Sequence, residues 1–207
     1  MVDDAAPDLN MPSVSEIHAL WVDEAQLVVR RVSMPDGLSE HVVGGIVTEW
    51  PDVGVTAAEA AHYAKAVAWD NDGRIFRDYV FEERRTELSW GASSSGITWI
   101  IDIAEGLSSE ALTLAAYYAI QKIRGRHAHS FDPGPLTVDR ARDKVRQSIG
   151  LVYEIDAASL RVVGDSRSAD RREIKVEFVG DDGQSYWGRV SLLGGLYLTA
   201  EVGRSGQ

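Results

Sequence analysis

The stretch IKVEFVGDDGQSYWGRVSLL, residues 174–193, carries the clearest indication of the fold. Apolar and polar residues alternate on both sides of Asp181-Asp182-Gly183, which has the composition of a tight turn. Two alternating runs joined by so short a turn predict an antiparallel β-hairpin, because a parallel pair needs a longer crossover connection.

Three more apolar runs lie on either side of this hairpin in the sequence. They cover residues 151–155, 160–163 and 196–202, and Gly194-Gly195 supplies a second tight turn before the last of them. We therefore expect everything after Gly150 to form a C-terminal antiparallel β-meander.

Helical patterns precede the meander. Thr137 is a suitable N-cap for a helix whose apolar face repeats at helical spacing, and Gly150 is expected to end that helix. A second helix is predicted over residues 108–126, and a third over 57–69, where Thr56 and Glu59 form a capping box.

Strand-like runs occupy most of the remaining sequence. They cover residues 16–22, 25–33, 41–50 and 97–103, and Gly44-Gly45 is expected to weaken the third run or to mark a bulge. The runs 75–81 and 84–90 predict one hairpin or one long bent strand. The fold class is therefore α+β, with mixed or antiparallel sheets and about three helices.

The polar segment 127–135, with its Pro133-Gly134-Pro135 sequence, is the best candidate for a linker. We expect a flexible acidic tail over residues 1–14, an α+β part over 15–130, and a helix with an antiparallel sheet over 136–207. The last two can equally form one continuous domain.

Composition restricts the classes of protein to which the chain can belong. The 207 residues include no cysteine, which excludes disulfides, thiolate metal sites and cysteine nucleophiles. The N-terminus lacks the pattern of a signal peptide, and charges interrupt the most apolar stretch, so we expect a cytoplasmic protein without a membrane span. The formal net charge of −11 lies mostly in residues 1–73 and argues against a nucleic-acid partner.

His127, His129 and Asp132 form the most metal-like cluster in the sequence. Alternate residues of an extended segment can point two imidazole groups the same way, as a zinc or iron site requires. The competing interpretation is a solvated linker whose histidines extend the basic end of the preceding helix. No cofactor is predicted.

The Gly/Ser-rich loop 91–96 places Ser94 in a sequence that approximates the nucleophile elbow of serine hydrolases. Such an elbow needs a helix directly after the serine, whereas the residues that follow this loop have strand character. A loop between two strands is therefore the preferred interpretation.

A local concentration of basic residues stands out against the acidic background. Its six lysine and arginine side chains are candidates for anion binding: Lys122, Arg124, Arg126, Arg140, Arg142 and Arg146. They can instead contact the acidic first third of the chain, within one molecule or between two copies.

No motif identifies a reaction. The leading hypothesis is a non-enzymatic protein-interaction or assembly module that binds a protein partner or another copy of itself. A hydrolase or metal-dependent enzyme, with its site near residues 91–96 and 127–132, is the alternative. A sensor domain that binds a small ligand is a third possibility.

Overall fold

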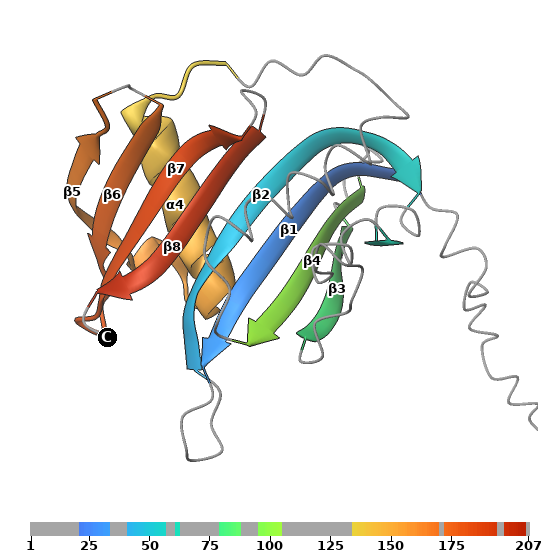
Figure 1. Ribbon diagram of the computed structural model, residues 1–207, viewed down its shortest axis with the longest axis horizontal. Helices are drawn as coiled ribbons and strands as arrows, with labels where there is room; N and C mark the ends of the chain where they lie inside the picture. Colours follow the sequence, from blue (N-terminus) through green and yellow to red (C-terminus); the bar gives the residue numbers. More distant parts are fainter. Residues whose placement is uncertain are drawn as a thin grey trace, which may run out of the picture.

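The computed structural model (Figure 1) describes residues 21–33, 41–56, 61–62, 79–87, 95–104, 134–169, 172–193 and 197–205. Its strands are β1 (Trp21–Ser33), β2 (His41–Thr56), β3 (Tyr79–Glu87), β4 (Ser95–Ala104), β5 (Arg161–Arg167), β6 (Glu173–Val179), β7 (Ser185–Leu193) and β8 (Tyr197–Ser205). Between β4 and β5 lie the α-helix α4 (Val138–Tyr153) and the short 3₁₀ helix η2 (Ala157–Ser159).

The described strands form one eight-stranded mixed sheet in the order β3-β4-β1-β2-β8-β7-β6-β5. All neighbouring strands are antiparallel except β1 and β4, which run parallel. The pairing of β2 with β8 joins the first four strands to the last four (Figure 1). The fold belongs to the α+β class, as the sequence predicted, and the described part of it is mostly β; its last four strands form the expected antiparallel meander.

Helix α4 begins where the sequence predicted. The hydroxyl of Thr137 accepts a hydrogen bond from the amide of Arg140 at 3.3 Å, which satisfies one of the unpaired N–H groups of the first turn. Of the other two predicted helices, the segment 108–126 lies outside the described residues. In the segment 57–69 the structure describes Ala61 and His62, and both are helical.

The predicted end of helix α4 was wrong. Helix α4 continues through Gly150 to Tyr153 and has Glu154 as its C-cap, so the predicted strand 151–155 is instead the end of this helix, its cap and the residue after it. The chain that follows folds back over Gly150, where a Cβ atom would lie 3.1 Å from the carbonyl oxygen of Ile155 and 3.3 Å from Cβ of Ala157. Gly150 therefore permits a close approach of the backbone and does not terminate the helix.

The N-terminal strands are longer and fewer than predicted. Residues 21–33 belong to one strand, β1, because a register irregularity between Val22 and Glu24 absorbs Asp23 without ending the strand. A second irregularity, between Arg31 and Val32, leaves Val43 as the extra residue of β2; the expected bulge thus lies beside Gly44, and Gly44 and Gly45 themselves keep regular partners. Of the two runs at 75–90, the structure describes residues 79–87, and they form the single strand β3.

One face of the sheet, called here the helix face, packs against α4. The apolar side chains of α4 that point to the sheet repeat every three or four residues and continue past Gly150 to Val152. They contact a core that extends from β6 across the sheet to β4; its strand residues are Val28, Val47, Ile100, Ile174, Val176, Phe178, Tyr186, Val190, Leu198, Ala200 and Val202.

The opposite face is apolar over the other half of the sheet. Because side chains alternate along a strand, the neighbours of Val28, Val47 and Ile100 point away from α4. They are buried, with at most 4% of each exposed: Ala25, Leu27, Val29, Ile46, Thr48, Ile97, Trp99, Ile101 and Ile103. Strands β1, β2 and β4 therefore carry buried apolar side chains on both faces of the sheet.

Candidate functional site

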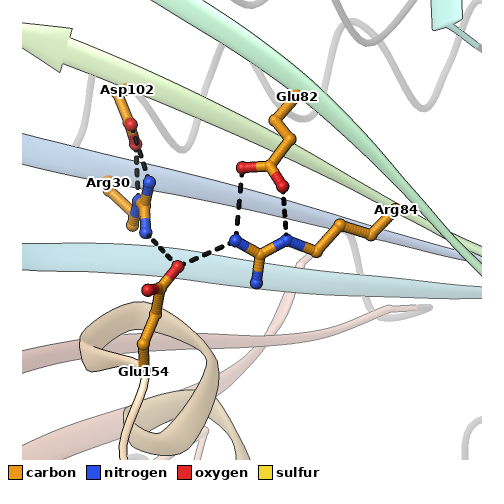
Figure 2. A network of polar contacts seen from close by, with 5 residues as sticks. All are labelled: Arg30, Glu82, Arg84, Asp102 and Glu154. Carbon is orange, nitrogen blue, oxygen red and sulfur yellow. Dashed lines mark hydrogen bonds and ion pairs between the residues drawn. The ribbon is translucent and has the colours of Figure 1, made fainter.

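Charged side chains occupy the helix face of β1, β3 and β4, beside the C-terminal end of α4. Five of them form one connected set of ion pairs and are called the arginine–carboxylate network: Arg30, Glu82, Arg84, Asp102 and Glu154 (Figure 2). The network brings together residues from three strands and the helix cap.

The inner part of the network is a pair formed by sheet register. Arg30 of β1 lies directly beside Asp102 of β4 in the parallel ladder, so both side chains point to the same face. Nε and Nη2 of Arg30 donate to the two carboxylate oxygens of Asp102 at 2.5 and 2.7 Å. This two-point contact fixes the orientation of the guanidinium plane as well as its position.

The outer part of the network lies on the edge strand β3. Glu82 and Arg84 are two residues apart, which places both on the helix face. Nε of Arg84 donates to one carboxylate oxygen of Glu82 at 2.6 Å, and Nη2 donates to the other at 3.2 Å. Each arginine is thus held by a carboxylate of the sheet.

Glu154 connects the two pairs. It caps α4 in a left-handed backbone conformation, with φ 55° and ψ 42°, and its N–H donates to the carbonyl of Gly150. Its Oε1 accepts from Nη1 of Arg30 at 3.0 Å and from Nη2 of Arg84 at 2.8 Å (Figure 2). The end of α4 is thereby attached to β1 and β3.

These contacts favour the charged forms of the glutamate and arginine side chains in the network. Hydrogen bonding by Arg84, and then by Arg30, lowers the pKa of Glu154, and Arg84 likewise lowers the pKa of Glu82. The pKa values of Arg30 and Arg84 are raised, mainly by their hydrogen bonds to Asp102 and Glu82 respectively. Both arginines and both glutamates therefore remain charged at neutral pH.

A second set of polar contacts lies between α4 and the sheet and joins Lys144, Glu49 and Gln26. Lys144 is 4% exposed, and its Nζ lies 2.6 Å from Oε1 of Glu49 on β2. The contact is ionic and not a well-aligned hydrogen bond, since Nζ has no partner of hydrogen-bond geometry among the described residues. Nε2 of Gln26 donates to the same Glu49 oxygen at 2.8 Å, and burial lowers the pKa of Lys144.

The β5 edge of the described sheet is the third feature. Six of its seven residues are exposed and Gly164 is half-buried. Val162 is 36% exposed and Val163 is 66% exposed; the remaining exposed large apolar side chain of the described residues is Val80, at 62%, on the other edge strand β3. Apolar surface is thus presented to solvent at the sheet edges.

The candidate site residues predicted from sequence are described only in part. Lys122, Arg124, Arg126, His127, His129 and Asp132 lie outside the described residues, as does Ser94. Within the described ranges, no three histidine, aspartate or glutamate side chains are grouped in a way that could hold a metal ion.

The three arginines of α4 in the predicted anion-binding set are present and partly exposed. Arg142 forms ion pairs with Asp139 at 3.4 Å and with Asp165 at 2.5 Å. Arg146 forms one with Asp143 at 3.5 Å and lies over the ring of Phe178, and Arg140 is also engaged within the chain. Anion binding by this helix stays a prediction.

Sequence reasoning missed the arginine–carboxylate network. Its signal is present, because Arg30 and Asp102 are charged residues inside otherwise apolar strand runs, LVVRRV and WIIDIA. Charged residues are almost never buried unless they are paired, so each of these predicts a partner without identifying it.

Comparison with models of known protein families, with curated proteins and with solved structures found no match to this chain. None of the helices in the described ranges is long and apolar enough to cross a membrane. The geometry of the described residues is therefore the basis for a functional proposal.

Proposed function

We propose that the protein is a non-enzymatic assembly module in which two copies associate through the β5 edges of their sheets. The observation that carries this proposal is the exposure of Val162 and Val163 on a strand that, among the strands the structure describes, pairs with β6 alone. An edge strand presents unpaired backbone groups, and exposed apolar side chains beside them favour contact with another strand.

Strand β5 is held firmly, which lowers the entropic cost of association. Nη2 of Arg142 on α4 forms an ion pair with Asp165 at 2.5 Å, and Arg167 donates a hydrogen bond to the carbonyl of Leu136. The first contact ties β5 to α4, and the second ties it to the residue just before the N-cap of α4. The edge is therefore in place before a partner arrives.

A second copy is the partner that this edge fits best. Two β5 edges related by a twofold axis cover each other, and the assembly closes at two chains. The register irregularity between Val162 and Gly164 interrupts the regular row of outward backbone groups, so it limits how far a partner strand can pair. A short, closed contact is the result expected from such an edge.

Light scattering coupled to size exclusion tests the proposal with two matched variants. The wild-type chain is expected to elute with twice the mass of one chain, and Val163→Lys is expected to elute with the mass of one. Val80→Lys places the same charge on the other edge strand at similar exposure, and it should leave the mass unchanged. A monomeric wild-type chain, or dissociation by Val80→Lys instead, would contradict the proposal.

A further inference from the structure

We propose that Arg30 and Arg84 form a carboxylate-binding site that Glu154 occupies from within the chain, and that an external carboxylate can take its place. Two guanidinium groups from different strands donate to one oxygen of Glu154, at 3.0 and 2.8 Å (Figure 2). The site is therefore seen with a carboxylate bound. This proposal is independent of the β5 edge.

We expect the site to keep its shape without Glu154. Asp102 holds Arg30 through Nε and Nη2, so Nη1 is the nitrogen that points to Glu154. Glu82 holds Arg84 through Nε and Nη2 in the same way. Because each guanidinium group has its own two-point contact, removal of Glu154 leaves both donors in position.

Glu154 is the replaceable member of the network. Its side chain is 52% exposed and extends from the end of a helix, whereas Arg30 and Asp102 are mostly buried in the sheet. Its backbone has the one positive φ angle among the non-glycine residues that the structure describes, and a side chain disfavours that conformation. Only Oε1 of its two oxygens takes part in the network (Figure 2).

Charge defines the class of ligand. The two arginines are balanced by Asp102 and Glu82, so the frame without Glu154 carries no net charge. A neutral frame with converging N–H donors favours a singly charged, planar acceptor over a dianion such as phosphate. The expected ligand is therefore a carboxylate group, from a small carboxylic acid or from an acidic side chain of a protein.

Chemical rescue tests the site. Glu154→Gly removes the carboxylate and suits the positive φ angle, and Glu154→Asn is a second variant that tolerates this conformation. Thermal unfolding is followed in sodium acetate and in sodium chloride of equal ionic strength. Acetate at about five times its Kd for the variant should raise the midpoint of either variant by roughly 2–4 °C, and it should raise the wild-type midpoint by less, because Glu154 competes for the site there.

The wild-type chain and a double variant serve as the two controls. Glu154→Gly combined with Arg84→Met should lose the acetate effect, because one of the two donors is gone. An equal acetate effect in the wild-type chain, an effect that survives Arg84→Met, or no effect in either single variant would overturn the proposal.

The source of the carboxylate is distinguished with two capped tripeptides. The Glu154→Gly variant is titrated with acetyl-Gly-Glu-Gly-amide and, as the matched control, with acetyl-Gly-Gln-Gly-amide. Selective stabilisation by the glutamate peptide supports a protein side chain as the ligand. Stabilisation by acetate alone supports a small carboxylic acid.

Discussion

Replacement of Glu49 is expected to destabilise the protein far more than replacement of its partner Lys144. The Lys144 side chain is 4% exposed, and Glu49 is the carboxylate beside its ammonium group. Glu49→Leu therefore leaves a buried charge unpaired, a change that costs about 3–5 kcal/mol in buried ion pairs. Because 35% of the Glu49 side chain reaches solvent, water can approach, and we expect about 3 kcal/mol.

The reverse substitution leaves no such defect. In Lys144→Met the apolar stem is retained, and the Glu49 carboxylate keeps both its exposure to solvent and the hydrogen bond from Gln26. The expected loss is below about 1 kcal/mol. Urea unfolding at pH 7 measures both free energies of unfolding. Equal losses, or a larger loss for Lys144→Met, would refute the assignment of Lys144 as a buried ammonium that depends on Glu49.

The pH dependence gives a second measurement of the same pair. Burial lowers the pKa of Lys144 below its ordinary value of 10.5, so the unfolded chain binds more protons than the folded one as the pH approaches that value. The free energy of unfolding should therefore rise with pH in this window, up to the unfolded pKa. Lys144→Met should lack this rise. If the free energy of unfolding rises equally with pH in the wild-type chain and in Lys144→Met, the lowered pKa of Lys144 is contradicted.

Two further substitutions probe the network and the core. Arg84 lowers the pKa of Glu154, so the Glu154 carboxylate stabilises the fold at pH values above its unfolded pKa. This contribution is lost as the pH falls through the folded pKa. Glu154→Gln should therefore flatten the dependence of the free energy of unfolding on pH between about pH 5 and 3. Gly188→Ala should cost about 1–3 kcal/mol in urea unfolding, because a Cβ atom there would overlap the side chain of Val145. Gly164→Ala is the control, since a Cβ atom at Gly164 meets nothing within 4 Å, and equal losses would refute the packing argument.

Features set by neighbouring residues could be predicted from the sequence. The turn at Asp181-Asp182-Gly183 and the cap at Thr137 each depend on a few adjacent positions, and both are present. The role of Gly150 could not be predicted in the same way, because the chain at Ile155 and Ala157 determines it by folding back over the helix. Local composition is compatible with either a stop or a close approach.

The arginine–carboxylate network depends on pairings over long sequence distances. Arg30 and Asp102 are 72 residues apart, and Arg30 and Glu154 are 124 apart. The parallel register of β1 and β4 decides that the first two meet, and no turn between these strands specifies that register. Only the presence of charged residues in apolar runs was available from the sequence.

The seam between β2 and β8 has a consequence for the order in which the chain folds during synthesis. The hydroxyl groups of Thr48 and Thr199, which meet across this seam, are 151 residues apart, and β8 is the last of the described strands to be synthesised. Until then one edge of β2 lacks its neighbour, whereas the hairpins from β5 to β8 close between residues near in sequence. The sheet of the N-terminal strands is therefore completed only when β8 has been synthesised, and until then the growing chain carries an unpaired edge at β2.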